Sequence, residues 1–311
     1  MYGFSILQLI ILMLLVALAS DLMSKGTIEL EKRFGKGITG GVILGIINAL
    51  PETIIVTEAL LNGFYEVALG SALGGNILLF TLGLGVVSIV YYIKYRSKVI
   101  QLEGEINIEY YSLVVATLVL LISIIYGKLN IYLSLCLLFI YAFYVFKRYK
   151  NYSSRRDSFS KNNVKRGIIY LLIGGFLLIF ITKYFIISVI NTAEILGVPT
   201  FLITVLLTPL AGELGENLIA VKLISSSPSD ATTAIINFMG SKLENMTLLL
   251  SIIGISQTIS LRSSVLELIM ILFATIIFLG ILKDRNIKIN EGISLFLIYT
   301  ILIAILIKFS A

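Results

Sequence analysis

The 311-residue sequence contains no histidine, no tryptophan and a single cysteine, Cys136. Without histidine or a second thiol, the chain lacks the common ligands of zinc and haem, and it can form no internal disulfide and no histidine proton relay. We therefore expect no bound cofactor. The lone thiol is most simply a small apolar residue, and we expect Cys136 to be buried.

Charged residues are also scarce, at 14% of the chain against roughly 25% in an ordinary soluble domain. Hydrophobic residues make up 58%, and the mean hydropathy is +1.01. Apolar runs of about 20 residues, long enough to cross a bilayer, alternate with short polar segments. We predict an all-α integral membrane protein with ten transmembrane helices, at about 4–20, 37–61, 66–92, 108–126, 130–146, 167–190, 200–223, 229–252, 264–282 and 290–308.

Positive charge is unevenly distributed along the chain. The net charge of +6 could suggest a nucleic-acid partner, but Lys and Arg gather in alternate loops, at 21–36, 93–107, 147–166 and 283–289. The opposite loops hold only Lys128 and Arg262, with Lys308 near the C-terminus. By the positive-inside rule the basic loops are cytoplasmic. We therefore expect a multi-pass protein of the cell membrane with both termini extracellular, whose surroundings are lipid and not nucleic acid.

The first apolar run has a second interpretation, because the small residues of "ALAS" at 17–20 resemble a signal-peptide cleavage site. Residues 1–6 contain no Lys or Arg, however, and the repeat described next includes this segment. We therefore expect a first transmembrane helix.

Two stretches of the sequence resemble each other, one from Ser20 to about residue 56 and the other from Thr182 to about residue 221. Each contains a glycine-bearing apolar segment that leads to an acidic residue, and another glycine-bearing segment follows, at 67–85 and 234–254. Because five spans is an odd number, the second copy would enter the membrane in the opposite orientation. We predict two inverted five-helix repeats, 1–146 and 167–311, joined by a cytoplasmic linker at 147–166.

The acidic residues of the two copies are Glu52, which follows Pro51, and Glu213 or Glu216. A carboxylate near the bilayer centre costs roughly 2.5–3.5 kcal/mol, and a proline inside a helix about 3 kcal/mol. Proline also frees a carbonyl oxygen, and Ca²⁺ takes about six to eight oxygen ligands. Glu52 and Glu216 would together match the charge of one Ca²⁺. Glu213 lies on the same helix face as Glu216 and is the alternative partner.

Two structural roles for Glu52 compete with a role as a cation ligand. Its carboxylate could cap a helix, or it could reach the membrane surface. Glu58, six residues further on, is expected to be solvated and not a ligand.

The motifs "NALPE" and "GSALGGNILLFTLGLG" in the first copy, and "GELGEN" and "MGSKLEN" in the second, resemble the α-repeats of the calcium/cation antiporter superfamily. This superfamily includes sodium/calcium exchangers and cation/proton exchangers. The resemblance covers nearly the whole chain and implies a secondary active antiporter, not an enzyme, that moves Ca²⁺ against Na⁺ or H⁺ by alternating access. It implies a cation site at mid-membrane built from Glu52, Glu216, Asn48, Glu213, Ser241 and Asn245.

Several positions depart from the sodium/calcium exchanger pattern. Ala49, Gly75 and Gly212 lack hydroxyl groups that sodium would use, and Asn245 stands where an aspartate is common. Asn48, four residues before Glu52, is instead similar to the pattern of cation/proton exchangers. We therefore expect protons to be the coupling ion, with transport of another divalent cation as the alternative within the class.

Lys242 and Glu244 belong to neither pattern, and we treat them as possible modulators of the site. Lys242 could neutralise Glu213 or Glu244 as a tethered cation, or could form an ion pair with no part in transport. Two other classes of function are alternatives, a membrane-embedded enzyme and a non-transporting scaffold. No span contains an aspartate pair or a nucleophile with a base, and a scaffold does not explain acids at matching points of two repeats.

Overall fold

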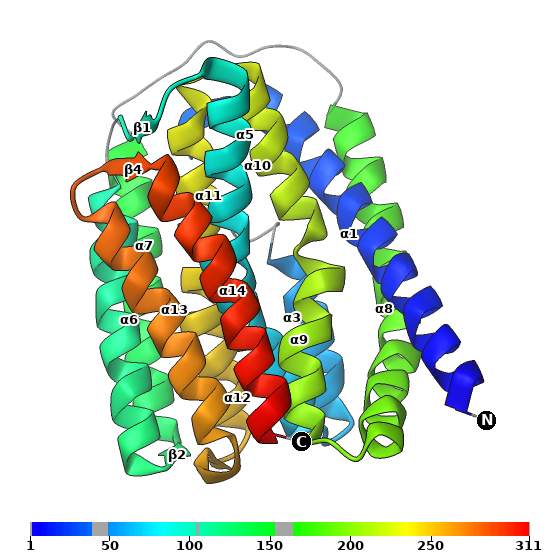
Figure 1. The fold of residues 1–311 in the computed structure, drawn as a ribbon. Helices are drawn as coiled ribbons and strands as arrows, with labels where there is room; N and C mark the ends of the chain where they lie inside the picture. The colour runs from blue at the N-terminus through cyan, green and yellow to red at the C-terminus, as the bar shows by residue number, and fades with distance from the viewer. Residues whose placement is uncertain (1, 39–48, 104–105, 153–163, 311) are drawn as a thin grey trace.

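The structure, a computed structural model, describes residues 2–38, 49–103, 106–152 and 164–310, which form a helical bundle (Figure 1). The elements of the first half are α1 (Tyr2–Ile38), α3 (Leu50–Leu61), α4 (Tyr65–Ile77), the π-helical turn η2 (Leu78–Gly83), α5 (Leu84–Tyr95), β1 (Val99–Gln101), α6 (Asn107–Tyr126), β2 (Lys128–Leu129) and α7 (Ile131–Tyr152). Those of the second half are α8 (Val164–Leu196), α9 (Thr200–Gly212), α10 (Leu214–Ser226), α11 (Asp230–Glu244), the π-helical turn η3 (Asn245–Leu249), α12 (Leu250–Ser256), β3 (Ile259–Ser260), the short 3₁₀ turn η4 (Arg262–Ser264), α13 (Val265–Leu282), β4 (Asn286–Lys288) and α14 (Ile289–Ser310).

Six helices in the described ranges are long and apolar enough to cross a membrane, or seven if α9 and α10, which meet at 44°, count as one broken span. The other predicted spans are carried by helices with polar or shorter apolar segments. These are α3, which begins next to residues outside the description, α11 with α12, and α14. The all-α membrane fold expected from the sequence is confirmed.

Several predicted boundaries are wrong. Residues 21–36, expected to be a loop after a first span at 4–20, continue α1 as one helix of 37 residues. The helices of the spans predicted at 130–146 and 167–190 are longer than expected, because α7 runs to Tyr152 and α8 begins at Val164. The span expected at 200–223 is two helices that meet at Glu213. A segment with many polar residues can remain helical where it packs against a neighbouring helix, because tertiary packing supplies most of the stability of a helix. Hydropathy alone does not reveal such packing.

α1 continues as a helix because it lies along α8, and glycines bring the two backbones into close contact (Figure 1). A Cβ atom built on Gly26 would lie 2.7 Å from the carbonyl oxygen of Gly167, and one on Gly174 would lie 2.7 Å from that of Ala19. These distances leave no room for a side chain at either glycine. Small residues permit such close approach between membrane helices.

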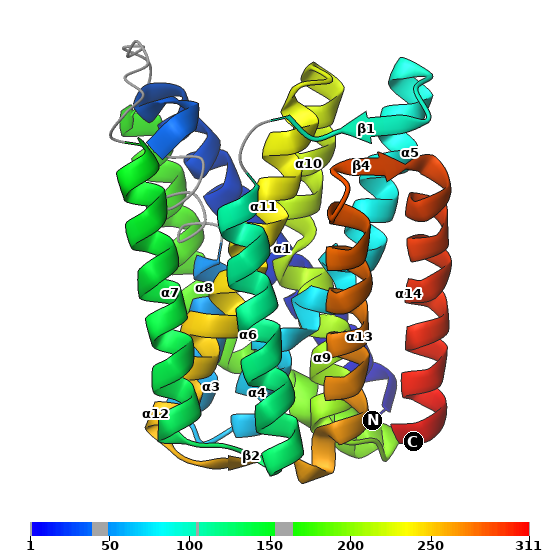
Figure 2. The same ribbon diagram turned by 90° about the vertical axis from the view of Figure 1, so that its left-hand side faces the viewer.

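Two short antiparallel sheets connect the halves, one at each end of the bundle (Figure 2). β1 pairs with β4, so that Val99 lies opposite Lys288, and β2 pairs with β3, so that Lys128 lies opposite Ser260. β1 and β3 each precede the fourth long helix of their half, whereas β2 and β4 each precede the last one. The two pairings therefore exchange places when the halves are exchanged, as a pseudo-twofold arrangement of inverted repeats requires.

Large apolar side chains cover the outer faces of the bundle, which suits contact with lipid. Leu14, Phe139, Phe176, Phe273 and Ile301 are examples from five helices. Cys136 on α7 is exposed as well, so its predicted burial is wrong. The physical reason is that a thiol on a lipid-facing surface is already in an apolar environment and does not need burial by protein.

Candidate cation-binding site

Two helices begin in the middle of the bundle, and each carries an acidic residue in its first turn. α3 follows Ala49, with φ −84° and ψ 1°, and α10 follows Glu213, with φ −85° and ψ −4°. The first acids of the two helices are Glu52 and Glu216, each three residues after this conformation. The positive end of a helix dipole favours a carboxylate there.

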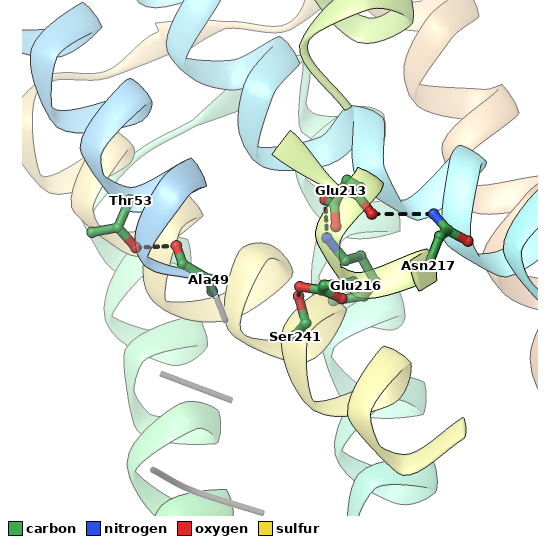
Figure 3. Close-up of polar contacts among 7 residues, drawn as sticks. Ala49, Thr53, Glu213, Glu216, Asn217 and Ser241 are labelled. Atoms are coloured by element: carbon green, nitrogen blue, oxygen red, sulfur yellow. Dashed lines mark hydrogen bonds and ion pairs between the residues drawn. The ribbon is translucent and has the colours of Figure 1, made fainter. Parts of the chain in front are cut away.

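The same kind of hydrogen bond, from a side chain to a backbone carbonyl, recurs at both helix starts. The Thr53 hydroxyl donates a 2.7 Å hydrogen bond to the Ala49 carbonyl, and the Asn217 amide donates one of 3.2 Å to the Glu213 carbonyl (Figure 3). Thr53 and Asn217 are each four residues beyond the acceptor. The two halves therefore build the start of the acid-bearing helix in one way.

A proline precedes the second of these helix starts and breaks the span formed by α9 and α10. Pro209 lies inside α9 and has no N–H group, so the carbonyl of Val205 lacks its normal helical partner. α4 packs directly over this carbonyl, since a Cβ on Gly74 would lie 2.6 Å from Val205 O and 2.8 Å from Pro209 Cγ. The helix ends three residues after the proline, at Gly212.

The Glu216 carboxylate is buried and has one partner among the described residues. The Ser241 hydroxyl on α11 donates a 2.7 Å hydrogen bond to its Oε1 atom (Figure 3). Its Oε2 atom has no protein partner in the described ranges. One oxygen of this acid thus remains free to bind a cation.

The Glu52 carboxylate is 4% exposed, and neither of its oxygens has a hydrogen-bond partner within the described part of the chain. It lies against the break between α9 and α10, because a Cβ on Gly212 would be 2.5 Å from its Oε1 atom. Glu213, Lys242 and Glu216 are near enough to interact with it electrostatically. A buried carboxylate without a partner is costly, and a bound cation would remove that cost.

Glu213 and Lys242 form a fully buried ion pair, in which the Lys242 ammonium donates to Oε1 of Glu213 (Figure 3). Of the two partners considered for Lys242, the structure has Glu213. Glu244, 2% exposed, interacts electrostatically with Lys242 and also with Tyr141 of α7.

Amide side chains add further oxygen atoms to this region. Asn76 and Asn245 are fully buried, and no protein partner is found for either amide group within the described ranges. Leaving such a group unpaired costs about 1–3 kcal/mol. Asn245 is one helical turn after Ser241 and therefore on the same face of its span.

No three carboxylates of the described residues gather closely enough to bind a metal ion by themselves. A cation bound here would take some of its ligands from amide, hydroxyl and carbonyl oxygens. Such a mixture is usual for Ca²⁺ and unlike the sites of softer metals.

The remaining site predictions fall in different places. Asn48 lies outside the described residues, so the predicted role of this residue stays a prediction. Glu58 is half-buried near the outer end of α3, and its carboxylate accepts a 3.0 Å hydrogen bond from Asn62.

Asn76 and Pro209 were not considered from the sequence, although one comparison would have found Asn76. "GGNILLFT" at 74–81 matches "GSKLENMT" at 240–247 residue by residue, and this places Asn76 opposite Lys242. The structure agrees, because the threonine that ends each match bonds to the carbonyl four residues earlier, Thr81 to Ile77 and Thr247 to Leu243.

Solved membrane exchangers share the fold. A structure described as the H⁺/Ca²⁺ exchanger CAX matches with a TM-score of 0.77 and 22% identity, over 98% of this chain and 86% of that one. The sodium–calcium exchanger NCX_Mj, soaked with Na⁺ and Sr²⁺, matches with a TM-score of 0.67 and 18% identity, over 98% and 99% of the two chains. The chain therefore has the ten-transmembrane-helix fold of these proteins, as predicted.

Comparison with curated protein sequences gives no match. A model of the sodium/calcium exchanger protein family, in contrast, matches residues 4–150 and 166–308, which together are most of the sequence. The chain therefore belongs to the sodium/calcium exchanger protein family, a family of membrane transporters and not of enzymes.

Proposed function

We propose that this exchanger moves Ca²⁺ across the cell membrane, with Glu52 and Glu216 as the two charged ligands. The observation that carries the proposal is the pair of equivalent helix starts, each with a buried acid that has at least one oxygen without a partner among the described residues. Two carboxylates neutralise one divalent cation. Ser241, Asn245 and the predicted ligand Asn48 would supply neutral oxygens.

We propose protons as the coupling ion. Sodium needs several neutral oxygens, and the first half lacks a hydroxyl at Ala49 and Gly75, whereas the second half keeps Ser241. Carboxylates in a low-dielectric cavity accept protons when the metal leaves. The H⁺/Ca²⁺ exchanger that shares this fold is a precedent for such coupling.

Flux measurements with purified protein in lipid vesicles test both statements. Vesicles loaded with Ca²⁺ receive either an inward H⁺ gradient at equal Na⁺ or an inward Na⁺ gradient at equal pH. Release of Ca²⁺ driven by the H⁺ gradient supports proton coupling. Release driven by Na⁺ alone contradicts the proton assignment and leaves the two-carboxylate site intact, whereas release under neither gradient contradicts Ca²⁺ exchange itself.

We further propose that the basic end of the bundle is cytoplasmic and that both termini are outside. Two of the basic segments support this proposal, since Lys98 next to β1 and Lys288 in β4 lie at one end of the bundle. α1 begins and α14 ends at the other (Figure 1). The division into halves at 1–146 and 167–311 is likewise a proposal, supported by the exchange of the two sheet pairings.

A further inference from the structure

A groove of about 580 Å³ lies between α6 and α7, two helices that run side by side at one face of the bundle (Figure 2). Toward the middle of the bundle its lining is apolar, with Val115 on α6 and Phe139, Ile140 and Phe143 on α7. Val115, Phe139 and Phe143 are exposed, so the groove opens to the surrounding lipid. Its volume is within the range of about 300–1,000 Å³ that is usual for ligand sites.

The groove becomes polar near the basic end of the bundle. Asn107 begins α6 there, and Lys147 follows Phe139 by eight residues on α7, which is about 12 Å along the helix. Arg285, just before β4, donates a 2.7 Å hydrogen bond to Oδ1 of Asn107, so a second basic side chain reaches this end. One leaflet of hydrocarbon is about 15 Å thick. The polar end and the apolar part are therefore spaced like the headgroup and the acyl chain of a phospholipid.

The positive charge of Lys147 is not balanced by an acid in the described part of the chain. Its ammonium has no ion-pair partner there, and its Nζ atom lies 5.4 Å from the ring centroid of Phe143. The buried Glu109 pairs with the neighbouring Arg148 instead. None of the described residues that line the groove is acidic. A negatively charged group at this end would therefore meet uncompensated positive charge.

We propose that this groove binds one anionic phospholipid, with its phosphate at Lys147 and Asn107 and an acyl chain along Phe139 and Val115. The ammonium and the Asn107 amide can donate to the phosphate oxygens, and basic pockets between membrane helices take anionic headgroups in this way. An apolar protein surface over the groove would bury the lysine charge at a cost, whereas a lipid phosphate balances it. The inference does not depend on which ions the protein transports.

The test uses the absence of tryptophan from the chain, because a single introduced tryptophan then reports on the groove alone. Full-length Phe139→Trp is placed in phosphatidylcholine vesicles that contain increasing fractions of phosphatidylglycerol or phosphatidylcholine with brominated acyl chains. Bromine quenches tryptophan fluorescence only at short range, so the two quenching curves give the relative affinity of the groove for the two lipids. One lysine near the membrane surface favours an anionic lipid by about 5-fold. We expect phosphatidylglycerol to be preferred by at least this factor.

Three variants serve as comparisons. Lys147→Gln in the Phe139→Trp protein should lower the preference about 5-fold, because the uncompensated charge is gone. Lys150→Gln is the matched control, since Lys150 is exposed on the same helix but does not line the groove, and it should keep the preference. Phe273→Trp on the lipid-facing side of α13 should show no preference between the lipids.

Each of three results would overturn the inference. The first is equal quenching of Phe139→Trp by the two lipids. The second is an equal loss of preference in Lys147→Gln and Lys150→Gln, which would indicate attraction to the whole basic end. The third is weak quenching by both lipids, which would mean that a second copy of the chain covers the groove. If Phe139→Trp does not fold, Phe143→Trp places the reporter one turn nearer Lys147, and the same results decide.

Discussion

At the scale of single residues, Glu52 and Glu58 form a matched pair on α3. Glu52 is 4% exposed and lies beside the break between α9 and α10, whereas Glu58 is half-buried near the end of α3. We expect Glu52→Gln to reduce Ca²⁺ flux at least about 100-fold, because the amide keeps the shape but loses charge that offsets dehydration of the ion. Glu58→Gln should keep most of the flux. Similar rates in vesicles for the two variants would show that the distinction between ligand and bystander is wrong.

Gly75 gives a second residue-scale prediction. Gly75→Ser restores the hydroxyl that the other half has in Ser241. Its Cβ, however, would overlap the Glu213 carboxylate and lie 2.6 Å from Lys242 Nζ. We expect this variant to lose stability, by about 1–3 kcal/mol as for an overpacked core. Adding Glu213→Ala and Lys242→Met should recover most of the loss, because both obstacles are removed. Melting temperatures in detergent for the variants would measure the coupling, and additive effects would contradict it.

At the scale of helices, the contact between α1 and α8 allows a test with adjacent glycines. A Cβ on Gly174 would lie 2.7 Å from Ala19 O and 2.7 Å from Met23 Cγ, whereas one on Gly175 would meet nothing within 4 Å. We expect Gly174→Ala to lower the melting temperature and Gly175→Ala to leave it unchanged or raise it slightly, as helix propensity favours alanine. Equal effects of the two substitutions would mean that close approach of the helices is not required.

α6 and α7 are joined by another buried ion pair, between Glu109 and Arg148. Arg148→Ala would leave the fully buried Glu109 without its counter-charge, and we expect a loss of about 3–5 kcal/mol in stability. Arg148→Ala/Glu109→Gln should be more stable than the single variant, since the unbalanced charge is gone. Thermal unfolding of the purified variants measures this, and a double variant no more stable than Arg148→Ala would count against the explanation.

The sequence predicted some elements better than others, for physical reasons. α6, α13 and α14 match their predicted spans closely, because lipid-facing helices are apolar throughout and hydropathy marks their ends. The C-terminal half of α1 was missed because its polar residues are held in a helix by contact with α8. In the site, Glu52, Glu213, Glu216 and Ser241 were recognisable as polar groups in apolar runs, but the filling of the space at Gly75 depends on three-dimensional contact.

At the scale of the whole molecule, orientation can be tested with two exposed lysines. Lys98 lies beside β1 at one end of the bundle, and Lys128 lies in β2 at the other. In a Cys136→Ser background, we expect a membrane-impermeant maleimide to label Lys128→Cys in intact cells and Lys98→Cys only after permeabilisation, because the basic loops are cytoplasmic. The reverse pattern of labelling would place the termini inside.

The π-helical turns η2 and η3 have a consequence for insertions and deletions. Each contains more residues than an α-helix of equal length, and the Thr81 and Thr247 hydroxyls donate to the carbonyls of Ile77 and Leu243 at these turns. Since each residue of an α-helix adds about 100° of rotation, loss of one residue here would turn Asn76 or Lys242 away from its present direction relative to the helix beyond. Over these segments both halves must therefore keep their residue count, even where the identity of the apolar residues is free to change.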